Sequence, residues 1–313
     1  MNKSIITVVF GVVIAVAAAY ALRTGMFSQK IPADNLVRGN KISVVASFFP
    51  LANFAQNVGG DFVNVANITP AGAEPHDYEP TARDIAKVYD SKLFIINGNG
   101  LDTWGDKIQE DLRSKGVFIV KMADNLDSLK NNSPDENLPY DPHFWLNPVN
   151  VEKEVDAIAE ALAKIDPDHK QAYNQNRDNY KKQLADLDRE FKIGLSECRQ
   201  HTIATSHNAF NYLASQYGLS TLYILGLSPD AEPSPKDIAE VANIARQKNI
   251  KYIFFESLVS PKLSQTVANE IGAKTLELNP IEGFSDEEIA NGKNYISQMK
   301  ANLVNLKIAL ECK

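Results

Sequence analysis

KISVVASFFPLANFAQNVGGDFVNVANITP, residues 41–70, carries the pattern from which the fold class follows. Its first part, KISVVAS (41–47), is an apolar and β-branched run typical of a buried strand. The next part, FFPLANFAQNVGG (48–60), has helical apolar spacing and stops at two glycines, and FVNVANITP (62–70) is a second strand candidate. A strand, a helix and a strand in this order predict a parallel sheet with helices on both faces.

The same alternation continues through the rest of the chain. Further apolar runs are strand candidates at 92–100, 116–122, 201–206, 219–226, 250–257 and 273–279. Segments with helical spacing lie between or after them at 81–91, 208–218, 235–249, 261–272 and 291–311. We therefore expect an α/β protein with two lobes, each with a mostly parallel sheet flanked by helices.

Two long helical stretches separate the two groups of strands. The first covers 151–165, and the second runs from about 169 to 197 with no glycine until Gly194. A helix of about 25 residues is near 40 Å long at 1.5 Å per residue, so it can join two lobes rigidly. We expect an N-terminal lobe at 41–149, a connecting helix region at 150–197 and a C-terminal lobe at 198–313.

The N-terminus has the features of an export segment. Lys3 and Arg23 flank an apolar run of 18 residues, Ile5–Leu22. This length lies between a signal-peptide core of about 7–15 residues and a spanning helix of about 20. Residues 1–22 are predicted to be either a signal peptide or an N-terminal membrane anchor, and the polar residues 23–40 a linker. Both alternatives place the remainder of the chain outside the cytoplasm.

Charge and cysteine content exclude two classes of protein. The net charge of −7 over 313 residues favours no polyanion, so we expect no nucleic-acid partner. Cys198 and Cys312 form no CxxC pair, which excludes a cysteine-rich zinc module. Because they end the connecting helix and the last helix, we predict that they form a disulfide; two unpaired thiols are the alternative.

Three of the five histidines lie where a parallel sheet collects ligands. His76 and His143 are in loops after strand candidates, and His207 follows the strand candidate 201–206. Imidazole is a ligand that Zn²⁺ prefers, and a metal can draw ligands from distant positions. His169, near a helix start, and His201, which begins a strand, are expected to lie elsewhere. The chain has no HExxH motif, so the common metalloprotease arrangement is absent.

The surroundings of these histidines carry a family resemblance. The segments are PAGAEPHDYEPTARDI (70–85), DPHFWLNP (141–148), SHNAFNYLASQYGL (206–219), FFESLVSPK (254–262) and ELNPIEGFSDEEIANGKNYISQMKANL (277–303). In this order the chain, from about Lys41 onward, resembles the zinc- and manganese-binding solute receptors of bacterial ABC importers. The resemblance implies two α/β lobes joined by a rigid helix, with a metal in the cleft between them. It also implies an ABC transporter permease as partner, and we expect a monomer.

By residue, the resemblance implies metal ligands at His76, His143 and His207. A histidine at the third position resembles the zinc-type members, whereas manganese-type members often have glutamate there; hard carboxylates suit Mn²⁺ and imidazoles suit Zn²⁺. The loop 122–142 departs from many zinc receptors, because it contains no histidine. The leading expectation is a Zn²⁺ receptor. The alternatives are a Mn²⁺ receptor, a metal-dependent adhesin and a zinc hydrolase.

We assign the fourth ligand to Glu282. Three neutral imidazoles leave the double charge of Zn²⁺ uncompensated. Glu282 follows a strand candidate in a turn between Pro280 and Gly283, which restricts its backbone. Some zinc-type members of the family resemble this chain in having the pattern NPxEG in this segment. The alternatives are Glu256, which ends a strand, water, and the two acids beside His76, Asp77 and Glu79. We expect some of three further side chains, Tyr78, Asn147 and Glu232, to orient the histidines by hydrogen bonds.

Overall fold

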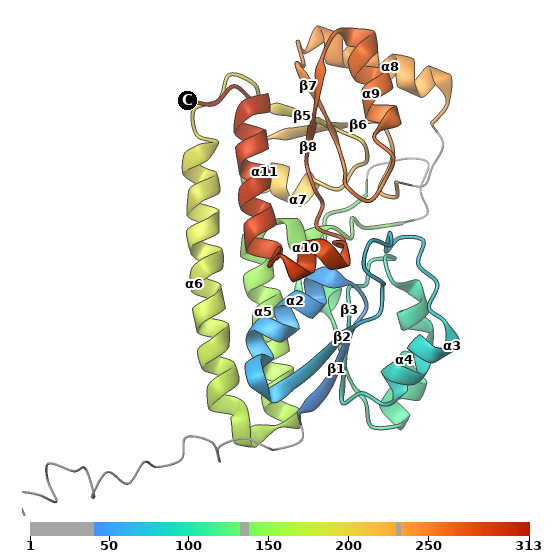
Figure 1. Ribbon diagram of the computed structural model, residues 1–313, viewed down its shortest axis with the longest axis vertical. Coiled ribbons are helices and arrows are strands. Elements are labelled where there is room, and N and C mark those ends of the chain that lie inside the picture. The colour runs from blue at the N-terminus through green and yellow to red at the C-terminus, as the bar shows by residue number, and fades with distance from the viewer. Residues whose placement is uncertain (1–40, 132–137, 230–232) are drawn as a thin grey trace, which may run out of the picture. The chain divides into compact units, whose positions relative to one another are not determined.

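The computed structural model describes residues 41–131, 138–229 and 233–313 (Figure 1). The predictions for 1–22 and 23–40, and that for Glu232, fall outside these residues. Among the described residues, no helix combines the length and the apolarity that a bilayer span requires.

The first lobe is built on a four-stranded parallel sheet. Its strands are β1 (Ile42–Ala46), β2 (Val63–Asn67), β3 (Leu93–Ile96) and β4 (Phe118–Lys121), in the order β2-β1-β3-β4. Its helices are α2 (Phe49–Gly59), α3 (Ala82–Tyr89) and α4 (Thr103–Ser114). Because β1 pairs with both β2 and β3, the chain reverses its direction of winding between β1 and β3, where the carboxyl ends of strands leave a crevice.

The second lobe repeats this arrangement. Its strands are β5 (Thr202–Thr205), β6 (Ser220–Tyr223), β7 (Tyr252–Phe255) and β8 (Lys274–Glu277), in the order β6-β5-β7-β8. Its helices are α7 (Asn211–Gln216), α8 (Pro235–Gln247), α9 (Lys262–Ile271), α10 (Asp286–Ala290) and α11 (Tyr295–Ala309). The prediction of two α/β lobes with parallel sheets is confirmed.

Two antiparallel helices connect the lobes. They are α5 (Pro148–Ile165) and α6 (Lys170–Gly194), and α6 runs along the flank of both sheets (Figure 1). Helix α6 packs against α2 and α5 at one end and against α11 at the other. Its 25 residues correspond to about 38 Å at 1.5 Å per residue. The rigid connection is therefore confirmed, while the boundaries proposed at 150 and 197 stay predictions.

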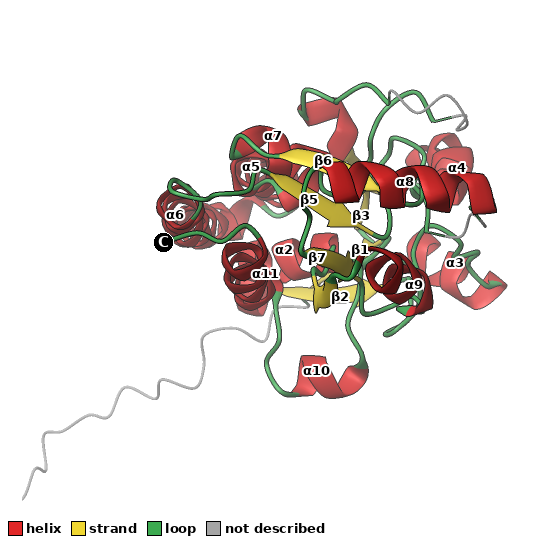
Figure 2. Cartoon of the chain, turned by 90° about the horizontal axis from the view of Figure 1, so that it is seen from above, coloured by secondary structure: helices red, strands yellow, loops and turns green. Residues whose placement is uncertain are grey.

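The apolar core explains why the lobes hold together. One large cluster contains residues of both lobes and of the helices that join them, among them Phe54, Trp145, Tyr180, Phe254 and Tyr295. Two smaller clusters pack β1 and β3 against α3 and α4, and β5 and β7 against α8 and α9. Figure 2 shows α6 and α11 on one side of the molecule and these outer helices on the opposite side.

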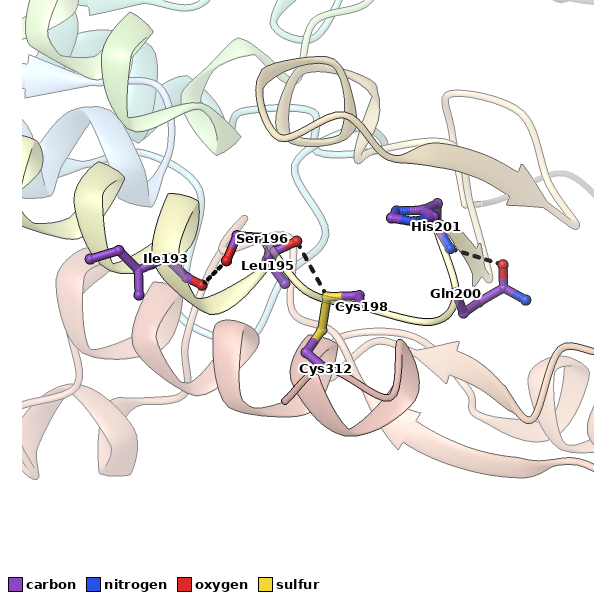
Figure 3. The surroundings of a disulfide bond; sticks show 7 residues. All are labelled: Ile193, Leu195, Ser196, Cys198, Gln200, His201 and Cys312. Carbon is purple, nitrogen blue, oxygen red and sulfur yellow. Dashed lines mark hydrogen bonds between the residues drawn. A yellow bond between two sulfur atoms is a disulfide. The ribbon is translucent and has the colours of Figure 1, made fainter.

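A disulfide joins the end of the connecting region to the end of the chain. Cys198 and Cys312 are bonded, 114 positions apart in the sequence, as predicted (Figure 3). The bond attaches the C-terminal end of α11 to the segment between α6 and β5. Helices α4 and α10 were not predicted. Helix α10 has five residues, too few for a periodic pattern, and α4 contains Gly105 and a largely polar face.

Candidate metal centre

Four side chains from separate strand ends meet at one point. His76 lies in the loop after β2, and His143 precedes a 3₁₀ turn (Phe144–Leu146) in the segment after β4. His207 follows β5, and Glu282 lies beyond β8. In each lobe the parallel strands present their carboxyl ends at one edge of the sheet, so loops far apart in sequence can meet there. The structure brings together the four residues predicted as ligands.

Five of the six distances between the four donor atoms are close to the edges of a small tetrahedron, and all four atoms lie within 4.8 Å of one another. Nε2 of His143 lies 3.1 Å from Nε2 of His76 and 3.4 Å from Nε2 of His207. Oε1 of Glu282 lies 3.4 Å from Nε2 of His76, 3.4 Å from that of His143 and 3.7 Å from that of His207. Zinc–ligand bonds of about 2.0–2.1 Å in a tetrahedral site give edges of about 3.3–3.4 Å between donors. The distances in the protein bracket that value.

The site is dry. His143 and His207 are completely buried, Glu282 is 1% exposed and the side chain of His76 is 5% exposed. Among the described residues, neither carboxylate oxygen of Glu282 has a hydrogen-bond partner. A buried carboxylate without a donor is costly, unless a cation or protonated rings compensate its charge. The unsatisfied carboxylate is the feature that best fits a metal ion at the centre of the cluster.

Asp141 orients His143 from behind. Its Oδ1 atom lies 2.8 Å from Nδ1 of His143 and accepts the backbone N–H of the same histidine at 2.9 Å. Its other oxygen accepts a hydrogen bond from Nδ2 of Asn211 at 2.9 Å, and Tyr212 donates to its backbone carbonyl. Because the Asp141 carboxylate accepts a hydrogen bond at Nδ1, the proton of the neutral ring is on Nδ1. The lone pair on Nε2 then faces the cluster.

Glu256 has the same position relative to His207. Its Oε2 atom lies 2.6 Å from Nδ1 of His207, an ion-pair contact whose angles are not those of an aligned hydrogen bond. Its Oε1 atom accepts hydrogen bonds from the hydroxyl of Ser206 and, at 3.3 Å, from the backbone N–H of His207. The contact follows from strand order, because β5 and β7 are neighbours and the two residues extend from their carboxyl ends.

The electrostatics of the cluster favour a positive charge at its centre. Burial opposes protonation of His143, but the Asp141 and Glu282 carboxylates outweigh it and raise the pKa above the ordinary 6.5. Burial likewise opposes charge on His207, yet Glu256 and Glu282 raise its pKa well above that value. Burial lowers the pKa of His76, and Glu282 offsets this only in part. For Glu282, burial is outweighed by the three imidazoles, which hold its pKa well below the usual range.

The side chains predicted to orient the histidines have other partners. The hydroxyl of Tyr78 donates to Asp84, and the side chain of Asn147 caps α5 by accepting the N–H of Val149. Neither of these two side chains therefore orients a histidine by a hydrogen bond. Asp141, two residues before His143, was missed, although its spacing could have identified it. Glu256, the alternative fourth ligand, is not among the four clustered side chains. It contacts Nδ1 of His207, the ring nitrogen that faces away from the cluster.

The other candidates lie apart from the cluster. Asp77 and Glu79 are exposed. His169 pairs with Asp166 at 2.7 Å and stacks on Phe62, and His201 is exposed at the start of β5, as expected.

Comparison with known proteins identifies the family of this chain. The model of the family described as "Zinc-uptake complex component A periplasmic" matches residues 44–309. The high-affinity zinc uptake system protein ZnuA of Bacillus subtilis is 37% identical over 308 residues, which cover 95% of this chain and 96% of that protein.

Two solved structures show the same fold. The Zn(II)-bound AdcA of Streptococcus pneumoniae has a TM-score of 0.78 and 38% identity over 87% of this chain; the match covers 58% of that longer chain. The laminin-binding protein Lmb of Streptococcus agalactiae, described as having adhesin and metal transporting activity, has a TM-score of 0.79 and 33% identity. That match covers 86% of this chain and 99% of Lmb.

Proposed function

Because this chain belongs to the family of periplasmic zinc-uptake complex component A, we propose that it is an extracytoplasmic receptor which captures one Zn²⁺ ion and delivers it to an ABC transporter permease. The family consists of binding components of zinc uptake, so the chain is not an enzyme. In the proposal His76, His143, His207 and Glu282 are the ligands. The observation that supports it best is the buried Glu282 carboxylate, which lacks a hydrogen-bond donor among the described residues and faces three imidazoles.

The donor set favours Zn²⁺ over Mn²⁺. Three imidazole nitrogens and one carboxylate suit the borderline-soft Zn²⁺ ion, whereas Mn²⁺ prefers oxygen ligands in a larger shell. The four donors lie within 4.8 Å of one another, and Oε1 of Glu282 lies 3.4–3.7 Å from the three imidazoles, which suits a small four-coordinate ion. The single carboxylate lowers the net charge of the bound ion from two to one.

A closed shell of four protein donors also argues against hydrolysis. A catalytic zinc keeps one position open for water, usually with three protein ligands. In the proposal Glu282 takes the position that water would have, since its oxygen lies 3.4 Å from two of the imidazoles. The arrangement suits an ion that is held and later released.

Metal titration of the full chain in mild detergent tests the proposal. We expect one tight Zn²⁺ site per chain in competition with a chelator, and much weaker Mn²⁺ binding at equal free concentration. Two tight sites, or a preference for Mn²⁺, would contradict it. Delivery is tested by zinc-dependent growth of cells that lack the gene, because loss of the receptor should impair growth only when zinc is scarce.

An adhesive role is a second candidate, and the resemblance to Lmb favours it. The measurement is binding of the chain to immobilised laminin, with and without Zn²⁺. Saturable binding would add this role to metal capture, and its absence would restrict the chain to transport.

A further inference from the structure

The turn that carries Glu282 has an unfavourable backbone conformation. Ile281 has a φ of 62°, a left-handed value that is rare for a β-branched residue, and its side chain is completely buried. Its backbone N–H donates to Oδ1 of Asn279 at 2.7 Å. Such a conformation persists only where surrounding contacts impose it, and these contacts can be identified.

Asn302 of α11 holds the beginning of this turn. Its Oδ1 atom accepts the backbone N–H of Asn279 at 3.0 Å, and its Nδ2 atom donates to the carbonyl of the same residue at 2.7 Å. The amide thus acts as a neighbouring strand would, two residues beyond the end of β8. Asn302 is completely buried, and Nε2 of Gln298 donates to its Oδ1 atom at 3.0 Å.

Glu282 depends on the backbone for its position. Among the described residues its carboxylate has no hydrogen-bond donor, and Oε1 meets the three imidazoles only at 3.4–3.7 Å, so no short side-chain bond sets its direction. The turn is held at Asn279 by Asn302 and at Pro280 by Trp145, whose Nε1 atom donates to the Pro280 carbonyl at 2.7 Å. We infer that Asn302 is a positioning residue for the metal site: by holding Asn279, it imposes the strained turn that directs the Glu282 carboxylate toward the three histidines.

This inference rests on the proposed function, in which Glu282 is a zinc ligand. Its consequence is that the fourth ligand is already in place before the ion arrives. Zinc binding then does not have to order the turn, so no ordering cost reduces the affinity. Other groups that orient metal ligands act in the same way. Loss of Asn302 should let the turn relax, and the ion would be held by three histidines and water.

A double-mutant cycle in the full chain tests the coupling of the two residues. The variants are Asn302→Ala, Glu282→Ala and the combination, each measured by zinc competition titration. Asn305→Ala is the matched control, since Nδ2 of Asn305, on the same helix, donates to the carbonyl of Glu277, the last residue of β8, at 2.8 Å. That bond lies before the turn, so its loss affects stability but not the direction of Glu282.

We expect Asn302→Ala to weaken zinc binding about tenfold, the lower end of the range for groups that orient ligands. In the Glu282→Ala background the same change should alter affinity by less than about twofold, because the ligand it positions is gone. Asn305→Ala should lower Tm and keep the parent affinity. A full tenfold loss in the Glu282→Ala background, or equal affinity of Asn302→Ala and the parent, overturns the inference.

The cobalt-loaded proteins provide a second readout. The visible spectrum of bound Co²⁺ reports its ligands, and that of Asn302→Ala should shift toward the spectrum of Glu282→Ala, while that of Asn305→Ala should match the parent. If Asn302→Ala does not fold, Asn302→Asp keeps the size and the acceptor for Asn279 and should show a smaller shift in the same direction; a parent-like spectrum for this variant overturns the inference. Failure of the parent to bind zinc, or parent affinity in Glu282→Ala, refutes instead the proposed function or its fourth ligand.

Discussion

Nε2 of His76 lies 3.1 Å from Nε2 of His143, although 67 positions separate the two residues. The ring of His143 is held by Asp141 through its other nitrogen, so its Nε2 atom is directed at His76 and not at a structural partner. Two imidazoles that face each other in a buried site, beside a carboxylate, are best explained by a cation that all three share.

The first prediction concerns the order of the ligands. His207→Ala should weaken zinc binding more than Glu282→Ala, because water replaces a carboxylate more readily than it replaces a nitrogen held by Glu256. Chelator competition at one pH provides the comparison. Parent affinity in Glu282→Ala would exclude this residue as a ligand.

The second prediction concerns Asp141. Asp141→Ala should weaken zinc binding about 10–100-fold, because His143 loses the partner that fixes its ring and its tautomer. Asp166→Ala is the control, since Asp166 contacts Nδ1 of His169 at 2.7 Å in the same way but outside the cluster. Similar losses in both variants would indicate a general effect on the fold.

The third prediction is the pH dependence of zinc affinity. Without metal, the carboxylates raise the pKa of His143 and of His207 above 6.5, so these rings bind protons that zinc must displace. Apparent affinity should therefore fall as pH is lowered, beginning above pH 6.5, by about tenfold per pH unit for each proton displaced. Titrations from about pH 8.5 to 5.5, together with proton release in unbuffered solution, measure this. A flat profile would contradict the histidine ligation.

The fourth prediction concerns Glu154 of α5, a completely buried residue whose two oxygens lack hydrogen-bond partners among the described residues. Burial raises its pKa well above 4.5, so the folded protein keeps the proton that the unfolded chain releases above pH 4.5. Glu154 therefore lowers stability as pH rises above 4.5, by at most about 1.4 kcal/mol per pH unit.

Glu154→Gln should remove this penalty and raise the free energy of unfolding at pH 7, with little gain near pH 4. The exposed Glu160 on the same helix provides the control, and Glu160→Gln should give no pH-dependent gain. Denaturant unfolding at the two pH values decides; an equal effect at both would contradict the assignment of a neutral buried acid.

The fifth prediction concerns the disulfide. Closing a loop of 114 positions is worth about 4–5 kcal/mol in the chain-entropy model, an upper figure in practice. Reduction of the parent should lower Tm, whereas a variant with both Cys198→Ser and Cys312→Ser should start from the lower Tm and not respond to reductant. Detection of two free thiols in the unreduced parent would refute the bond.

Local patterns in the chain were sufficient for most of the architecture. Alternating apolar strands and helices with glycine stops predicted both sheets, and the length of α6 predicted the rigid connection. The positions of Cys198 and Cys312 at helix ends predicted their bond. These predictions succeed because hydrophobic periodicity and helix-end signals depend on residues that are close together in the sequence.

The convergence of the site required the fold. Glu256 reaches His207 because β5 and β7 are neighbours, and that strand order results from packing between segments about 50 residues apart. The left-handed conformation of Ile281 and the grip of Asn302 on Asn279 likewise depend on α11 packing beside β8. The sequence thus named the histidines and Glu282 through their loops and a family resemblance. Their mutual distances, and the partners that aim them, come from long-range contacts that leave no periodic trace in the chain.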